Sequence, residues 1–205
     1  MRVVAIVLAA GASTRFGARK LLAPLAGRPV LQHALDALAG AGLGDVVVVV
    51  GEDAAAIEAA IAWRGERRVR NPRPQDGLSS SLRAGLDAAA EDPAVDAVLV
   101  ALGDQPALRA DVVAAVLAVG EATDRPIVRA RYAEDDAPNP VLVRRTAWAL
   151  AAGLEGDRGL GPLLAHRAEL VAEALVTGHN PDVDTPADLE RLVTGRPAVP
   201  GRPLR

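Results

Sequence analysis

Cysteine is absent from this chain of 205 residues. The absence excludes disulfides, cysteine-ligated zinc, iron–sulfur clusters and thiol catalysis. Only three histidines occur, dispersed at positions 33, 166 and 179, so we do not expect a metal site built from several histidines. Aromatic residues make up 2% of the chain, too few for the stacking platforms that bind single-stranded nucleic acids. Carboxylates, hydroxyls and cationic side chains remain as the groups that can carry chemistry.

An excess of positive charge is also missing. Lys and Arg number 23 against 26 Asp and Glu, a formal net charge of −3. This balance argues against a nucleic-acid partner, although a small phosphate pocket needs only two or three cations. No apolar run approaches the ~20 residues of a membrane span, and the run after Met1 is short for a signal peptide. We therefore expect a cytoplasmic protein without a membrane partner.

The apolar residues, half of the chain, are grouped in alternating strands and helices. Valine-rich, continuously apolar strands are typical of a parallel sheet with helices on both faces. The fold class is thus α/β, with one domain over residues 1–195 and a flexible tail over 196–205. The expected strands are Val3–Ala9, Asp45–Val50, Arg67–Arg70, Asp96–Leu102, Pro126–Ala130, Val141–Val143 and Ala174–Val176. The expected helices are Pro29–Ala41, Ala54–Trp63, Ser79–Ala90, Asp111–Val119, Thr146–Ala152 and Thr185–Val193.

The loop after the first strand contains small residues, two glycines and three cations. It runs from Ala9 to Lys20 and includes Arg15 and Arg19. Consecutive backbone amides and cations at the carboxyl end of a parallel strand suit phosphate oxygens. The loop matches neither the P-loop nor the dinucleotide fingerprint, because the glycine spacing fails both patterns. A glycine-rich connection with solvated cations is the alternative interpretation.

Carboxylates follow two other predicted strands. Asp104 ends the strand Asp96–Leu102, where a hard oxygen ligand suits Mg²⁺ that bridges nucleotide phosphates. Asp182 and Asp184 precede the last helix, and either would complete a metal site with Asp104. Helix capping is the competing explanation for all three, although Thr185 already supplies the cap of the last helix in a capping box.

A third polar group is the run Ser79, Ser80 and Ser81, which opens a predicted helix. The hydroxyls and amides there suit a base edge or a phosphate. N-capping explains one of the three serines and leaves the other two open.

Taken together, these segments resemble the MobA-like nucleotidyltransferases, and within them the molybdenum cofactor cytidylyltransferase branch. The resemblance covers residues 6 to about 192. Its strongest parts are LAAGASTRFGARKLLAPLAGRPVLQHAL, NPRPQDGLSSSLRAGL, VLVALGDQP, GDRGLGPLL and DVDTPADL. It implies a Rossmann-like sheet of the nucleotide-diphospho-sugar transferase type. The implied reaction joins the nucleoside monophosphate of a triphosphate to a phosphorylated acceptor and releases pyrophosphate.

The resemblance also implies roles for individual residues. Arg15 and Lys20 would neutralise charge in the transition state, and Asp104 would hold Mg²⁺ with Asp184 or Asp182 as second ligand. The nucleotide would lie against a set of residues from three segments: Leu8, Ala9, Ala10, Gly11, Arg15, Lys20, Ser79, Ser80 and Asp104. The chemistry is consistent, because attack on the α-phosphorus needs positioning and electrostatic relief more than covalent catalysis.

The expected donor is CTP, because the loop begins with LAAG, and the expected acceptor is molybdopterin, with a molybdoenzyme or its chaperone as a further partner. One segment departs from the family pattern: Asn139 stands where a histidine is common, in Asp135–Pro140. Transfer from GTP or to a sugar or alcohol phosphate therefore stays open. A nucleotide-binding chaperone without catalysis is the alternative from a different class.

Overall fold

A mostly parallel sheet forms the centre of the computed structural model, which describes residues 1–11, 16–17, 19–133 and 137–194, with Arg158 described by its backbone alone. Within these residues the sheet has seven strands in the order β5-β4-β1-β6-β8-β7-β9, and only β8 runs antiparallel to its neighbours. Its strands are β1 (Val3–Ala9), β4 (Val46–Val50), β5 (Arg67–Arg70), β6 (Ala97–Leu102), β7 (Ile127–Tyr132), β8 (Val141–Arg144) and β9 (Val171–Val176).

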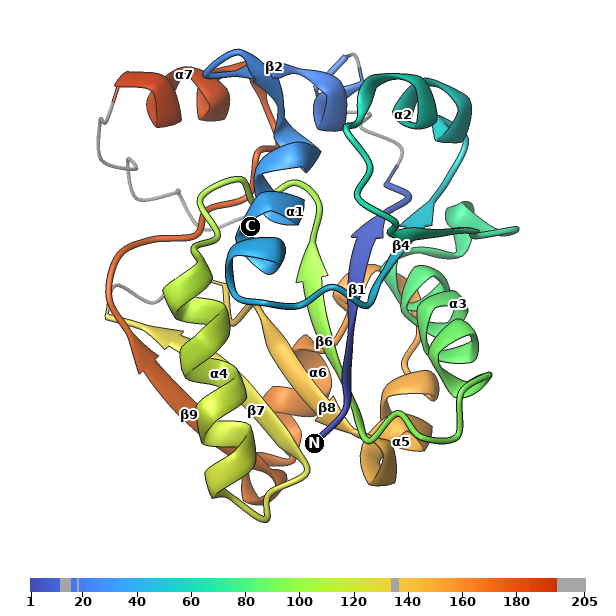
Figure 1. The fold of residues 1–205 in the computed structure, drawn as a ribbon, viewed down its shortest axis with the longest axis vertical. Coiled ribbons are helices and arrows are strands. Elements are labelled where there is room, and N and C mark those ends of the chain that lie inside the picture. Colours follow the sequence, from blue (N-terminus) through green and yellow to red (C-terminus); the bar gives the residue numbers. More distant parts are fainter. Residues whose placement is uncertain (12–15, 18, 134–136, 195–205) are drawn as a thin grey trace, which may run out of the picture.

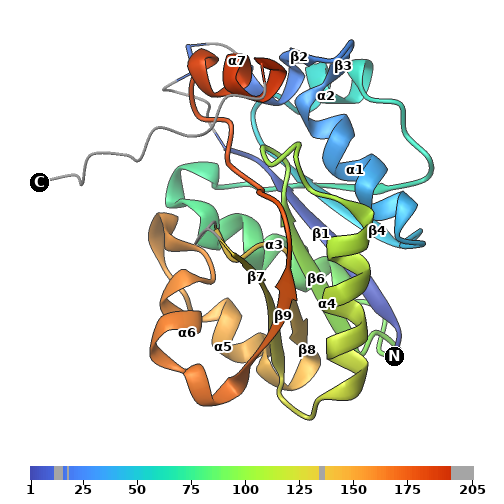
Figure 2. The same ribbon diagram turned by 90° about the vertical axis from the view of Figure 1, so that its left-hand side faces the viewer.

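Helices cover both faces of this sheet (Figure 2). The α-helices are α1 (Val30–Gly40), α2 (Ala54–Ala60), α3 (Leu78–Ala90), α4 (Ala110–Ala122), α5 (Trp148–Ala152), α6 (Gly161–His166) and α7 (Pro186–Thr194). Short 3₁₀ turns are η1 (Lys20–Leu22), η2 (Pro74–Asp76), η3 (Arg145–Ala147), η4 (Gly156–Arg158) and η5 (Ala168–Leu170), and β2 (Pro24–Leu25) and β3 (Arg28–Pro29) form a separate hairpin. The predicted fold class is confirmed.

Alternation along each strand divides the core into two layers. In β1, Ala5 and Val7 face the layer of α1 and α4, while Val4 and Ile6 face the layer of α3, α5 and α6. All four side chains are buried, as expected for a central strand with helices on both faces. Within the described part of the chain, no helix has the length and apolar character that crossing a bilayer requires.

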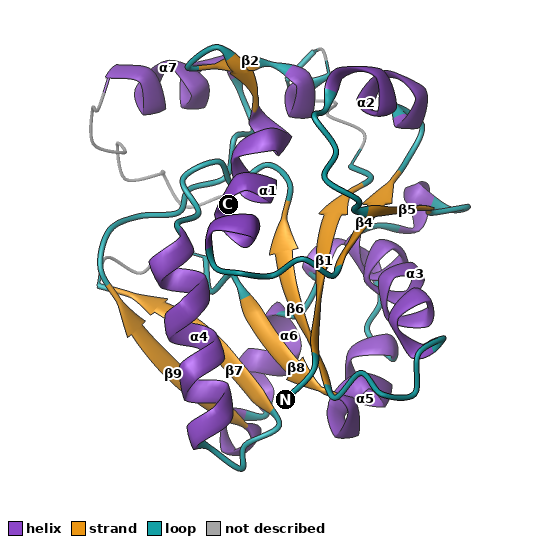
Figure 3. Cartoon of the chain, in the orientation of Figure 1, coloured by secondary structure: helices purple, strands orange, loops and turns teal. Residues whose placement is uncertain are grey.

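Strands β1 and β6 point toward the same edge of the sheet (Figure 3). Both strands end there, and α7 and the β2–β3 hairpin lie beyond them. Ligands of open parallel sheets bind at this edge. The parallel pairing of β1 with β4 and β6 therefore brings three distant loops to one place.

Several features of the fold differ from the sequence predictions. The expected helix Thr146–Ala152 divides into η3 and α5, and α6 and the β2–β3 hairpin were not predicted. Helix α3 begins at Leu78, with Gly77 as its N-cap and no side-chain cap, so the expectation that a serine hydroxyl caps this helix is wrong. Gly77 has a φ of +85°, and a side chain there would collide with the backbone of Gly156. Glycine is required at this position for both reasons.

Candidate functional site

Lys20 and Asp104 meet at the carboxyl edge of the sheet, together with Asp184. Lys20 opens η1, Asp104 lies two residues after β6, and Asp184 lies in the segment between β9 and α7. Lys20 Nζ is 2.6 Å from Asp104 Oδ2 and 3.0 Å from Asp184 Oδ1. These three loops are far apart in the sequence, and the parallel strands bring their ends together.

The ammonium of Lys20 is well shielded from water, since its side chain is 12% exposed. Burial alone lowers the pKa of Lys20, but the charges and hydrogen bonds of Asp104 and then Asp184 outweigh it, so the pKa lies above its ordinary value. Lys20 is therefore charged at neutral pH. The three side chains together have an excess of negative charge, because one ammonium faces two carboxylates.

Asp182 belongs to the same group but contacts a different partner. Its Oδ1 accepts a hydrogen bond of 2.8 Å from Gln105 Nε2. The residue is exposed on one side, whereas its carboxylate lies partly among protein atoms. Loss of hydration, followed by the charge of Asp104, raises the pKa of Asp182 to about 6. Water on the exposed side limits how much of this shift is felt as a change in stability.

Backbone contacts hold the segment 182–184 in place. The N–H of Val183 donates to the carbonyl of Asp104 at 2.9 Å, and Val183 is fully buried. At the start of α7, Thr185 and Asp188 form the predicted capping box, with the Thr185 N–H donating to Asp188 at 2.6 Å. Capping therefore does not explain Asp182 or Asp184. It does not explain Asp104 either, because the next helix begins only at Ala110.

The first loop leaves β1 directly beside this group. Leu8, Ala9 and Ala10 are buried at the end of β1, and Gly11 is exposed. Arg15 lies outside the described residues, as do the acidic residues 135 and 136 and the expected tail 196–205. The remaining cation of the loop, Arg19, forms an exposed ion pair with Asp53 at 2.8 Å.

The serines at the start of α3 are buried and take part in internal contacts. The Ser80 hydroxyl donates to the carbonyls of Gly77 and Arg73 and accepts a hydrogen bond of 2.8 Å from Asn71 Nδ2. The Ser79 hydroxyl is buried without a hydrogen-bond partner among the described residues. Ser80 is thus used for holding the 71–77 loop on α3, and the group at Lys20 does not include either serine in its hydrogen bonds.

Two buried amides were not singled out by the sequence reasoning. Gln105 and Asn180 are both fully buried, and Asn180 Nδ2 donates to Gln105 Oε1 at 3.1 Å and to the carbonyl of Asn139 at 3.3 Å. Gln105 directly follows Asp104, and this position beside a predicted site residue indicates that Gln105 lies near the site. Asn180 has no such signal, because only folding brings it to Gln105.

The family of the chain follows from comparison with known proteins. The sequence model of the MobA-like NTP transferase domain matches residues 5–172. The chain belongs to this family. A crystal structure of Rv0371c from Mycobacterium tuberculosis H37Rv superposes with a TM-score of 0.82 at 33% identity, covering 95% of this chain and 98% of that one. A second structure of Rv0371c, in complex with manganese, has a TM-score of 0.81 at 31% identity and covers 95% and 99% of the two chains.

Two curated relatives extend the comparison. The bifunctional protein GlmU of Agrobacterium fabrum is 36% identical over 174 residues, which cover 82% of this chain and 33% of GlmU. The matched part is between 24% and 39% of the length of the GlmU relatives. Nicotine blue oxidoreductase of Paenarthrobacter nicotinovorans is 34% identical over 204 residues, covering 93% of this chain and 96% of that protein. The curated relatives of this MobA-like protein therefore carry different activity names.

A divalent metal suits the donors of this MobA-like protein. Among the described residues, no group of three or more His, Asp or Glu side chains is arranged as a metal site. Two carboxylates, from Asp104 and Asp184, nevertheless converge on one cation, the Lys20 ammonium. Hard oxygen donors of this kind are the ligands that Mg²⁺ and Mn²⁺ prefer. The positively charged ammonium of Lys20 lies between the carboxylates of Asp104 and Asp184.

Proposed function

We propose that this MobA-like protein is a nucleotidyltransferase that transfers a nucleoside monophosphate to the phosphate of an acceptor. An acceptor phosphate oxygen bonds to the α-phosphorus of the triphosphate, the bond from that phosphorus to the bridging oxygen breaks, and pyrophosphate leaves. The observation that carries the proposal is the convergence of Lys20, Asp104 and Asp184 beside the end of β1. Such a transfer needs cations and a metal-binding carboxylate pair more than a covalent nucleophile.

Each residue of the group has a role in this proposal. Asp104 and Asp184 would hold the divalent ion, with Asp182 as an alternative to Asp184. When bound, Mg²⁺ or Mn²⁺ supplies positive charge that offsets the charge of the triphosphate. Lys20, displaced from the carboxylates by that ion, would turn to a phosphate oxygen, and Arg15 would assist it. The backbone of Leu8 to Gly11 would lie along the nucleotide, and Ser79 and Ser80 would shape the loop near its base or ribose.

The proposed donor is CTP and the first acceptor to test is molybdopterin, with a molybdoenzyme or its chaperone as recipient of the product. The support is the LAAG start of the first loop and the family resemblance. A second acceptor class, a different phosphate ester, is favoured by one observation: Asn139 occupies the position of the usual histidine, and its side chain lines an apolar pocket.

The test uses the purified full chain with CTP, GTP, ATP or UTP, each with Mg²⁺ or Mn²⁺. Pyrophosphate release is followed with molybdopterin, with glucose 1-phosphate and without acceptor. We expect release that depends on metal and acceptor, with CTP as the best donor. A preference for GTP would overturn the choice of donor and leave the reaction class standing. Tight nucleotide binding with no release for any acceptor would favour the chaperone alternative.

A parallel assay covers the relative from Paenarthrobacter nicotinovorans, whose name states an oxidoreductase activity on nicotine blue. Oxidation of NADH and NADPH in the presence of nicotine blue is measured with the same preparation. Turnover there at a rate above that of nucleotidyl transfer would contradict the proposed function.

A further inference from the structure

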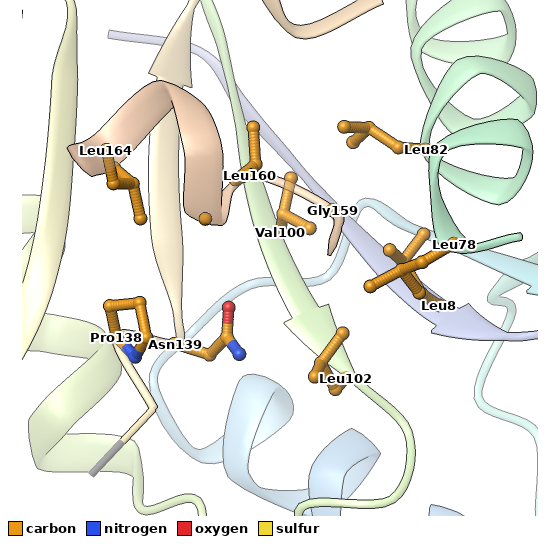
Figure 4. A pocket seen from close by; sticks show the side chains of 11 residues that line it. Leu8, Leu78, Leu82, Val100, Leu102, Pro138, Asn139, Gly159, Leu160 and Leu164 are labelled. Carbon is orange, nitrogen blue, oxygen red and sulfur yellow. The ribbon is translucent and has the colours of Figure 1, made fainter. Parts of the chain in front are cut away.

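An apolar pocket lies next to the carboxylate group, between the ends of β1 and β6, the start of α3 and the segment that leads into α6 (Figure 4). Its volume is about 180 Å³. The pocket is partly open to solvent, so a ligand can enter it without unfolding the core. Its walls consist of seven aliphatic side chains, one proline, two glycines and one amide, and they include Leu78, Leu102, Gly159 and Asn139.

The pocket is tied to the proposed reaction centre by the chain itself. Leu102 lies two residues before Asp104, so one wall and the carboxylate group share a loop. On the opposite side, the carbonyl of Asn139 accepts a hydrogen bond of 3.3 Å from Asn180, which also bonds Gln105. A molecule in the pocket would therefore extend toward the place where phosphate chemistry is proposed.

Gly159 allows the side chain of Leu78 to pack directly against the backbone of the pocket wall. A side chain on Gly159, which has a φ of +49°, would come within 2.7 Å of Leu78 Cδ2. Leu78 packs against bare backbone here, which shapes the pocket.

Among the described residues, Asn139 is the one polar side chain that lines this space. Figure 4 shows the amide of Asn139 directed among the aliphatic side chains, and the structure gives that amide no hydrogen bond to another described side chain or backbone group. Its backbone carbonyl, by contrast, is satisfied by Tyr132 and Asn180. In the part of the chain that the structure describes, the pocket thus offers a mostly apolar surface and one side chain that can form hydrogen bonds, Asn139.

We propose that this pocket binds a compact hydrocarbon ring of an acceptor from the second class, a phosphate ester other than molybdopterin, with one polar substituent hydrogen-bonded to Asn139. An apolar cavity of about 150 Å³ holds a benzene ring, so the size fits a single six-membered ring. A sugar or a pterin carries several donors and acceptors, and each one left unpaired against leucine costs about tenfold in affinity. The same argument excludes a nucleobase. The proposal rests on the proposed function only where it identifies the ligand as the acceptor. Binding of the ring itself requires no nucleotidyl transfer.

The first experiment measures binding without catalysis, by saturation-transfer NMR and calorimetry on the full chain. Phenol and toluene are the pocket probes, and phenyl phosphate is compared with glucose 1-phosphate. We expect phenyl phosphate to bind about tenfold or more tightly than glucose 1-phosphate. Equal affinity, or tighter binding of glucose 1-phosphate, would overturn the proposal. Loss of phenol binding on saturation with CTP would also overturn it, because the pocket would then take the nucleobase.

Substitutions in the pocket wall test whether the ring binds in this pocket. Asn139→Leu removes the amide and should weaken phenol about fivefold to tenfold while leaving toluene unchanged or tighter. Leu102→Asn and Leu78→Asn, both at half-buried positions, should weaken both probes about tenfold. Leu175→Asn is the matched control, since Leu175 is 77% exposed on β9, and it should change neither. Equal loss of phenol and toluene in Asn139→Leu, or wild-type affinity in both leucine variants, would place the ring elsewhere.

The two proposals fail separately. Ring binding in the pocket without pyrophosphate release for any acceptor would leave the pocket assignment and remove the proposed function. Pyrophosphate release with glucose 1-phosphate or molybdopterin, but not with phenyl phosphate, would do the reverse.

Discussion

Lys20 and Asp104 are separated by 84 residues in the sequence, and their side chains meet at 2.6 Å. The sequence predicts that Lys20 contacts a phosphate and that Asp104 holds a metal together with Asp184 or Asp182. The structure joins them to Asp184 in one charge group, in which each partner sets the electrostatics of the other. Changes in metal, in nucleotide and in pH should therefore act on the same small set of atoms.

Replacement of Lys20 tests the cation between the carboxylates. We expect Lys20→Ala to lower turnover by about 100-fold or more. It should also lower the free energy of unfolding of the metal-free protein by ~1–3 kcal/mol, because two partly buried carboxylates lose their counter-charge. Mn²⁺ should then raise the melting temperature of Lys20→Ala more than that of the wild type. Arg167→Ala, which removes an exposed pair with Glu169, is the control and should change little. Wild-type turnover in Lys20→Ala would contradict the assignment.

Asp104→Asn separates a metal ligand from a structural residue. Lys20 keeps Asp184, and Asp182 loses a repulsive neighbour, so the stability of the metal-free protein should change by less than about 1 kcal/mol. Turnover should fall about 100-fold or more, and the stabilisation by Mn²⁺ should disappear. Melting curves in EDTA and across a Mn²⁺ series measure both effects. A destabilised variant that retains activity and its response to Mn²⁺ would show that Asp104 is structural.

The pH dependence of stability tests Asp182. Its pKa is about 6 in the folded protein, above the ordinary value of 3.8, so the folded state holds this proton more tightly than the unfolded state. The contribution of Asp182 to stability is therefore most favourable below pH 4 and falls as the pH rises toward 6. Asp182→Asn should be more stable than the wild type at pH 8 and equal to it below pH 4. Urea unfolding in EDTA at pH 4, 6 and 8 measures the difference, and a pH-independent difference would refute the shifted pKa.

The two serines of α3 form a matched pair. The Ser80 hydroxyl has three hydrogen bonds, so Ser80→Ala should lower the free energy of unfolding by ~1–3 kcal/mol. The Ser79 hydroxyl is buried without a partner among the described residues, so Ser79→Ala should leave stability unchanged or raise it. Denaturation of both variants under one condition compares them. A reversed order would mean that the Ser79 hydroxyl has a partner, such as a bound water.

Local pattern carried much of this protein's architecture. The apolar run Val3–Ala9 became β1 with its predicted ends, and the Thr-Pro-Ala-Asp sequence at 185–188 formed its capping box. Such features depend on neighbours along the chain: burial on both faces dictates a continuous apolar strand, and a helix end needs a cap. The place of Asp104 after β6 was predictable for the same reason, since strand ends mark the ligand-binding edge of a parallel sheet.

Pairings between distant residues were decided by tertiary structure alone. No spacing indicates that Asn180 bonds Gln105, that Ser80 turns inward to Asn71, or that Lys20 lies between two carboxylates. The antiparallel β8 and the pocket beside Leu102 likewise arise only when separate segments pack together. Sequence patterning reports which groups must be buried, because that depends on hydrophobicity alone. Which buried group meets which depends on how the elements cross the sheet, and that is settled only by packing.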